Sequence, residues 1–162
     1  MTKRAYLTNL GRSTWALVNT YYAVLRDKEY FPDTLWIFTE QSYQPKLDKA
    51  ITALKILSEE FGINPVVQTR VVNDWDFLAA GKEIISEVKK LKAHGYEVAI
   101  DITPGRKALI VASLITGIKV KIDHIFYLAI KTTEDAAKPY MMISQQIQQI
   151  RDFMEDARLV VG

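Results

Sequence analysis

The chain has 162 residues, of which 49% are hydrophobic and 25% charged, and its mean hydropathy is −0.02. These values predict one globular domain over residues 1–162 and exclude a mainly disordered chain. The sequence has no cysteine and two histidines, which excludes disulfide scaffolds, thiol nucleophiles and most histidine-rich metal sites. A net charge of +2 is too small for the broad basic surface of a protein that binds duplex DNA.

Neither a targeting signal nor a membrane span is visible in the sequence. After Lys3 and Arg4, only three apolar residues precede the next polar one, which excludes the apolar region of a signal peptide. No apolar run approaches the roughly 18 residues of a membrane-spanning helix. We therefore expect a cytoplasmic protein that does not contact membranes.

Five apolar segments are predicted to be strands, and a helix is predicted after each of the first four. The predicted strands are residues 4–9, 34–39, 65–72, 96–100 and 122–130. Strands that are apolar over most of their length and alternate with helices indicate a parallel sheet covered on both faces. The fold class is thus α/β, a doubly wound, mainly parallel, Rossmann-like sheet with the expected order 3-2-1-4-5.

Local signals place the starts of these helices. The first begins at residue 12 or 13, and its apolar stripe of Trp15, Val18, Tyr22 and Leu25 is expected to face the core. The second begins at Pro45, the third is capped by residue 73 or 74, and the fourth begins at residue 104.

The end of the chain is predicted to add an edge strand and one more helix. The strand covers residues 140–144, and the helix turns Ile147, Ile150 and Met154 inward. Both elements belong to the same single domain.

In a doubly wound sheet, ligands bind beyond the carboxyl ends of the strands, where the strand order reverses. For the expected order this point lies between the first and fourth strands, so the loops 9–14 and 101–107 should flank it. The first loop (NLGRST) brings one glycine, one guanidinium and two hydroxyls to a helix start, which favours phosphate. The alternative is that Ser13 only caps the helix.

The second loop (DITPGRK) places two adjacent cations at the start of a helix. Cations at that end oppose the helix dipole, which indicates an anionic partner. The loop does not match the GxxxxGK[ST] phosphate loop or the GxGxxG dinucleotide motif. The helix over residues 108–117 is almost uncharged, so it is expected either to lie in the interior of a monomer or to form a dimer contact.

Residues 101–107 match the pattern D-x-T-x-G-x-K after a strand, and a Gly-Arg-Ser loop follows the first strand. Together these features resemble the CARF domains, the CRISPR-associated Rossmann-fold sensors of cyclic oligoadenylates. Family members often carry a HEPN ribonuclease, in which four to six residues separate an arginine from a histidine. No arginine lies at that spacing before His94 or His124. We expect no second domain, because the predicted elements of the first use the whole given sequence.

The resemblance implies a stand-alone ring nuclease, which cleaves cyclic tetra-adenylate and ends the antiviral signal of type III CRISPR systems. In that subgroup, a serine of the first loop and a lysine of the second matter for cleavage, and these correspond to Ser13 and Lys107. The alternative is a sensor that binds the ring intact and acts through a partner protein. The residues expected to bind the ligand are Asn9, Gly11, Arg12, Ser13, Thr14, Asp101, Thr103, Gly105, Arg106 and Lys107.

The residue types available also predict the mechanism. Because the chain lacks cysteine and clustered carboxylates, we expect cleavage without a metal or cofactor, with a ribose 2′-hydroxyl of the ligand as nucleophile. A two-fold symmetric ring is best held by two copies of the same loops, which predicts a homodimer. The expected product is a linear oligoadenylate with a 2′,3′-cyclic phosphate.

For several other polar and aromatic residues, a structural role is the stronger expectation. His94 is expected to cap carbonyls at a helix end, and His124 to pack in or beside a strand. Tyr43 and Trp75 are candidates for stacking on adenine, although packing is the stronger expectation for both. The carboxylates at positions 74 and 76 are expected in a first helical turn rather than in a metal site.

Overall fold

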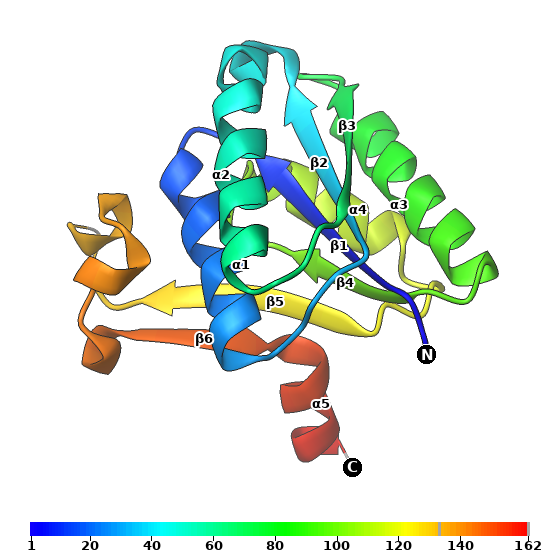
Figure 1. The fold of residues 1–162 in the computed structure, drawn as a ribbon. Coiled ribbons are helices and arrows are strands. Elements are labelled where there is room, and N and C mark those ends of the chain that lie inside the picture. The colour runs from blue at the N-terminus through cyan, green and yellow to red at the C-terminus, as the bar shows by residue number, and fades with distance from the viewer. Residues whose placement is uncertain (133, 162) are drawn as a thin grey trace.

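The computed structural model describes residues 1–132 and 134–161. They form one six-stranded sheet with helices on both faces (Figure 1). The strands are β1 (Arg4–Leu10), β2 (Thr34–Glu40), β3 (Val66–Val72), β4 (Glu97–Asp101), β5 (His124–Ile130) and β6 (Gln148–Asp152). The helices are α1 (Thr14–Asp27), α2 (Leu47–Glu60), α3 (Phe77–Ala93), α4 (Lys107–Thr116) and α5 (Phe153–Val161).

The strand order is β3-β2-β1-β4-β5-β6. The first five strands are parallel, and β6 pairs antiparallel with β5. The predicted doubly wound fold and the order of its five parallel strands are therefore confirmed. Since β1 and β4 are neighbours, the order reverses between them, and their carboxyl ends lie at one edge of the sheet.

Two apolar cores lie on opposite faces of the sheet. Helices α1 and α2 cover one face, and α3 and α4 cover the other (Figure 1). Successive side chains of β1 point to opposite faces, so Tyr6 belongs to the first core and Leu7 to the second. No helix within the described residues is long and apolar enough to cross a membrane.

Helix α1 turns only part of the predicted stripe toward the core, against which Val18 and Tyr22 pack partly buried. Leu17, Tyr21 and Val24 are fully buried together with Leu25, whereas Trp15 is 41% exposed. The prediction that Trp15 faces the core is therefore wrong. Two apolar stripes run side by side along this helix, and the helical period alone does not tell which of them meets the sheet.

The starts of three helices are shifted from the predicted positions, and α4 begins at Lys107 instead of residue 104. Asp76 caps α3 by accepting a hydrogen bond from the Ala79 backbone N–H at 3.0 Å, so the cap follows residues 73 and 74. Pro45 lies in a 3-10 helix, η1 (Gln41–Lys46), and α2 begins after it. At the end of α3, Nδ1 of His94 lies 2.7 Å from the Lys90 carbonyl oxygen, which confirms the predicted cap.

The segment after β5 also differs from the prediction. Residues Tyr140–Met142 form a 3-10 turn, η3, because the Tyr140 backbone N–H donates to Oδ1 of Asn19 at 2.8 Å. The edge strand is β6 instead, and Ile150 lies buried at its centre. The predicted edge strand over 140–144 is therefore wrong, and neither Ile147 nor Ile150 lies on the terminal helix.

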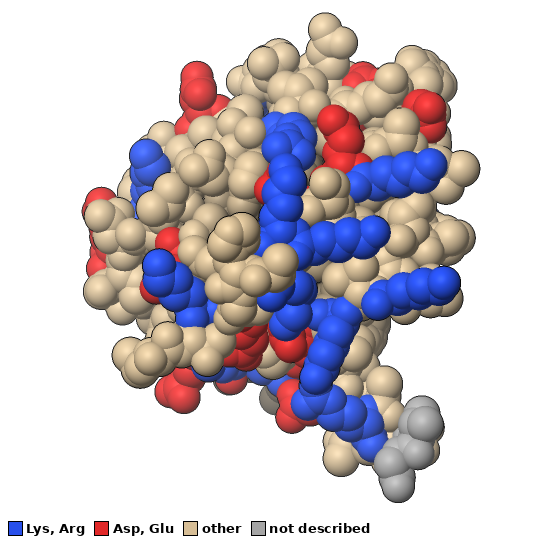
Figure 2. All heavy atoms as spheres, turned by 90° about the vertical axis from the view of Figure 1, so that its right-hand side faces the viewer, with Lys and Arg blue, Asp and Glu red and all other residues tan. Residues whose placement is uncertain are grey.

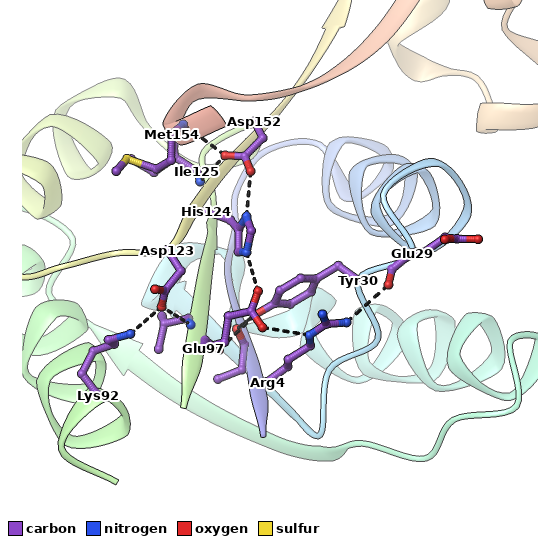
Figure 3. Close-up of polar contacts among 12 residues, drawn as sticks. Arg4, Glu29, Tyr30, Lys92, Glu97, Asp123, His124, Ile125, Asp152 and Met154 are labelled. Atoms are coloured by element: carbon purple, nitrogen blue, oxygen red, sulfur yellow. Dashed lines mark hydrogen bonds and ion pairs between the residues drawn. The ribbon is translucent and has the colours of Figure 1, made fainter. Parts of the chain in front are cut away.

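A charged cluster joins β6 and α5 to the rest of the sheet at the amino end of β5 (Figure 3). His124 lies between two carboxylates, with Nδ1 at 2.7 Å from Asp152 Oδ2 and Nε2 at 2.6 Å from Glu97 Oε1. Arg4 Nε donates to the other oxygen of Glu97 at 3.0 Å. Asp152 also accepts from the backbone N–H of Met154 at 3.1 Å, where α5 begins.

These contacts shift the pKa of each partner. The hydrogen bond to Asp152 raises the pKa of His124 despite burial, and Glu97 adds to the effect. Burial would raise the pKa of Glu97 and Asp152, but their hydrogen bonds with His124 hold both below the ordinary values. The cluster is thus most stable with a charged histidine between two charged carboxylates. His124 has a larger role than the packing predicted for it.

We predict a pH-dependent contribution of His124 to stability, measured as the difference in the free energy of unfolding between the wild type and His124→Asn. The raised pKa makes this difference, about 2 kcal/mol, fully present below about pH 6.5, and it is lost as pH rises through the folded-state pKa. It also falls in acid, as Glu97 and Asp152 are protonated. Urea titrations from pH 4 to 9 measure it. An equal difference at pH 6 and 9 would contradict the assignment, and His94→Asn is the control.

Candidate functional site

The loops after β1 and β4 touch through their backbones. A Cβ added to Gly11 would lie 2.7 Å from the backbone nitrogen of Gly105, so a side chain at position 11 would force the loops apart. Gly105 has a φ of +97°, a conformation that favours glycine. A Cβ on Gly105 would in turn meet the Cβ of Asn9 at 3.0 Å. The two loops predicted to flank the site therefore meet.

Asp101 supports this contact from below. The side chain is fully buried, Oδ2 accepts from the Thr8 hydroxyl at 2.9 Å, and Oδ1 accepts from the Thr103 backbone N–H at 2.9 Å. The Thr103 hydroxyl in turn accepts from the Leu128 backbone N–H at 3.0 Å. Burial raises the pKa of Asp101 to about 7, although the hydrogen bonds from Thr103 and Thr8 oppose it. Asp101 thus holds the loop in place rather than facing solvent.

The first loop leads directly into α1. Ser13 caps the helix, and its Oγ accepts from the Ala16 backbone N–H at 3.3 Å. Both Arg12 and Ser13 are exposed, and Thr14 is partly exposed. Lys46 from η1 donates to the Arg12 carbonyl oxygen at 2.7 Å and so fixes the backbone of this loop. The capping role of Ser13 is confirmed, and its hydroxyl remains accessible to solvent.

The two cations of the second loop differ in their surroundings. Arg106 Nε lies 3.2 Å from Oε2 of Glu40, the last residue of β2, whose side chain is 2% exposed. Lys107, the first residue of α4, is exposed. Among the described residues, no carboxylate pairs with Lys107 or with Arg12. Two cations at the loop junction are therefore available to an anion, and the third is already paired.

Sequence reasoning missed Glu40 and the role of Asp74. Asp74 accepts from the Gln41 backbone N–H at 2.6 Å and from the Ser42 hydroxyl at 2.5 Å, so it caps η1 from the neighbouring loop. The Ser42 hydroxyl chiefly lowers its pKa. A carboxylate beside Gln41 and another beside Arg106 order the loop after β2. An acidic residue at the end of a buried strand was the available signal for Glu40.

Neither aromatic candidate for stacking, Tyr43 or Trp75, lines the pocket beside the first loop. Lys46 Nζ lies over the ring of Tyr43, 5.7 Å from its centroid. Trp75 is 83% exposed. This pocket of about 560 Å³ lies between α1 and α2. It is lined by Arg12, Ser13, Thr14, Trp15, Val18, Lys49 and Ala53. The exposed Trp15 thus lines this pocket together with two cations, Arg12 and Lys49.

Basic residues are not confined to these loops. Figure 2 shows Lys and Arg gathered on the face of the molecule that carries α3. The exposed lysines of α3 include Lys82, Lys89 and Lys90. Charge alone therefore does not mark the site. The site is distinguished by cations placed beside a glycine contact and an open pocket.

Comparison with known proteins identifies relatives in fold. No protein-family model matches the sequence, and no curated protein matches it. The structure is similar to that of Can2 from Sulfobacillus thermosulfidooxidans in complex with cyclic tetra-adenylate, with 14% identity and a TM-score of 0.55. It is also similar to Csm6 from Enterococcus italicus bound to cyclic hexa-2′-fluoro-hexa-dAMP, with 12% identity and a TM-score of 0.59.

These matches cover different shares of the chains. The match to Can2 covers 76% of this chain and only 31% of the Can2 chain. The match to Csm6 covers 99% of this chain and only 44% of the Csm6 chain. At such low identity the likeness concerns the fold. The comparison therefore confirms the Rossmann-like fold that the resemblance of the two loop motifs implies.

The glycine contact predicts the effect of one methyl group. Gly11→Ala should lower the free energy of unfolding by about 1–3 kcal/mol, because the new Cβ overlaps the backbone of Gly105. It should also speed amide hydrogen exchange at residues 102–106. Gly62→Ala is the matched control, since Gly62 has a φ of +70° but nothing within 4 Å of an added Cβ. If exchange in the second loop changes equally in both variants, the two loops do not depend on their contact.

Proposed function

We propose that this domain binds a cyclic oligoadenylate, with cyclic tetra-adenylate as the first choice, across a homodimer and cleaves it. It would act as a ring nuclease in the cytoplasm and switch off type III CRISPR signalling. Its proposed catalytic residues are Ser13 and Lys107. The remaining residues of loops 9–14 and 101–107 contact the ligand or shape its site.

The observation that carries this proposal is the junction of the two loops at the carboxyl ends of β1 and β4. There the Gly11–Gly105 contact brings Arg12 and Lys107 to one edge, beside a capped helix start and an open pocket. Exposed cations and free helix N–H groups favour phosphates. Solved structures of the same fold that hold cyclic oligonucleotides support the ligand class.

The pocket beside the first loop offers a place for a base of the ligand. Trp15 offers an apolar ring face on which a base can stack, and stacking of this kind contributes about 1–3 kcal/mol per base. Arg12 and Lys49 line the same pocket and suit the phosphates next to that base. Trp15 therefore replaces Tyr43 and Trp75 as the proposed adenine contact.

The site residues suggest how cleavage proceeds. The site offers a hydroxyl, cationic side chains and backbone N–H groups, and all of these are poor general bases. Because none of them would activate an external nucleophile, the ligand supplies its own. The ribose 2′-oxygen bonds to the adjacent phosphorus and gives its proton to solvent. The bond from phosphorus to the 5′-oxygen breaks, and that oxygen takes up a proton. The product carries a 2′,3′-cyclic phosphate and a 5′-hydroxyl.

In this reaction the protein contributes position and charge. Lys107 stabilises the negative charge that develops on the phosphorane, together with N–H groups at the start of α4. Ser13 orients the attacking hydroxyl or the phosphate by hydrogen bonding. Asp101, being fully buried, acts by holding the Thr103 backbone and not by touching the ligand. Without an efficient base, turnover should be slow, which suits a timer on a signal.

Helix α4 is the proposed dimer contact. Leu109 and Ala112 pack inside the domain, whereas Val111 is 53% exposed and Ile115 is 60% exposed. Ile118, just beyond the helix, is 83% exposed. Within this chain the helix therefore has an uncovered apolar face, which favours the dimer over the interior alternative. A second copy related by a two-fold axis would bring two sets of loops to one ring.

Replacing Lys107 should separate chemistry from binding. Lys107→Ala should lower the single-turnover cleavage rate of cyclic tetra-adenylate about a hundredfold, because a transition-state contact of about 3 kcal/mol is lost. Ser13→Ala should slow cleavage and leave much of the affinity. Lys89→Ala, an exposed lysine of α3, is the control. Rates are read by mass spectrometry of the products.

Two outcomes would contradict this mechanism. One is a wild-type rate for Lys107→Ala, and the other is loss of wild-type cleavage when a chelator is added. If the wild type binds the ring but releases no product over days, the protein is a sensor that acts through a partner, and the enzyme proposal is wrong.

Charge on the exposed face of α4 should break the dimer. Ile115→Glu should give a monomer at micromolar concentration by light scattering, because the apolar contact would bury an unpaired charge. Ile56→Glu is the control, since Ile56 on α2 is 55% exposed and lies outside the proposed contact. A monomeric wild type, with and without ligand, would overturn the dimer.

A further inference from the structure

The buried carboxylate at the end of β2 has an incomplete set of partners. Oε2 of Glu40 pairs with Arg106 Nε at 3.2 Å. Oε1 is buried and has no hydrogen-bond partner among the described residues. With 2% of its surface exposed, Glu40 lacks the solvent that usually stabilises a carboxylate. Its charge therefore depends mainly on one guanidinium.

Two charged groups act on Glu40 from neighbouring loops. Burial raises the pKa of Glu40, Arg106 opposes this, and the negative charge of Asp74 raises it further. Asp74 itself stays ionised, because the Ser42 hydroxyl and two backbone N–H groups lower its pKa. Of these two carboxylates, Glu40 is therefore the easier one to protonate.

Arg106 faces two possible anions. Glu40 occupies its Nε, while the side chain remains 37% exposed at the loop junction. The terminal N–H groups of an arginine bind phosphate in a bidentate manner. A phosphate at this position shares the guanidinium charge and adds a negative charge near a carboxylate that cannot reach water. When a buried carboxylate loses its compensating charge, its pKa rises, and binding a proton becomes the lowest-energy state.

We propose that the Glu40–Arg106 pair couples ligand binding to proton uptake: when a ligand phosphate engages Arg106, Glu40 takes one proton from solvent. This inference rests on the proposed function, since it requires a phosphate at Arg106, and it adds a regulatory property of that site. Glu40 is a positioning residue here, because it acts through Arg106 and does not touch the ligand.

The sign of the coupling follows from linkage. If the complex holds one more proton than the free protein, affinity rises as pH falls. The dissociation constant should increase up to about tenfold per pH unit above the pKa of Glu40 in the free protein, until the pH exceeds that of the complex. A signal-degrading domain with this property binds its ligand more tightly in an acidified cell.

The test uses cyclic tetra-adenylate and the whole chain. Isothermal titration of the wild type in two buffers with different heats of ionisation should show uptake of up to one proton per site. The dissociation constant, measured from pH 5 to 8, should rise with pH in the wild type. In Glu40→Gln, which keeps the shape and an oxygen acceptor for Arg106, it should be independent of pH. Glu60→Gln, an exposed residue at the end of α2, should behave as the wild type.

The outcomes separate this inference from the proposed function. Binding without proton uptake by the wild type, or the same pH dependence in Glu40→Gln, overturns the coupling and leaves the proposed function standing. No binding by the wild type at any pH overturns the proposed ligand and the coupling with it. The absence of proton uptake by the wild type would overturn the coupling even if Glu40→Gln does not fold.

Discussion

The site depends on a contact between two backbones. Gly11 and Gly105 approach so closely that no side chain fits between them, and this approach joins the loops after β1 and β4. The contact exists because β1 and β4 are neighbours in a parallel sheet, which brings their carboxyl ends to one edge. This contact positions the exposed cations, the capped start of α1 and the Trp15 pocket. A fold held by two apolar cores thus brings these groups together at one edge of the sheet.

Buried carboxylates organise that edge without facing the ligand. Asp101 lies beneath the second loop and holds the Thr103 backbone, and Glu40 holds Arg106. Burying either carboxylate without a partner would cost free energy, and each one has specific partners that compensate for its burial. At the opposite edge, His124 between Glu97 and Asp152 fixes the antiparallel strand and the last helix. The two edges therefore carry separate charge clusters, one built for stability and one open to an anion.

The apolar strands could be predicted because their patterns are local in the chain, and the strand order and the meeting of the two loops followed from the doubly wound fold class. Prediction failed where two patterns compete. Along α1, two apolar stripes are adjacent, and only packing against the sheet decides that Tyr21 is buried and Trp15 exposed. In β6, a single buried Ile150 among polar residues resembles a helix as much as an edge strand. The pairing of Glu40 with Arg106 joins residues 66 positions apart, and no local pattern reports it.

Amide chemical shifts during titration with cyclic tetra-adenylate test the central claim most directly, since each backbone N–H reports on its own surroundings. The largest shifts should fall on residues 11–14 and 103–107, on both sides of the Gly11–Gly105 contact, and the lysine-rich face of α3 should change little. Shifts that cluster on α3, or no shifts at saturating ligand, would contradict the assignment of the site to this edge of the sheet.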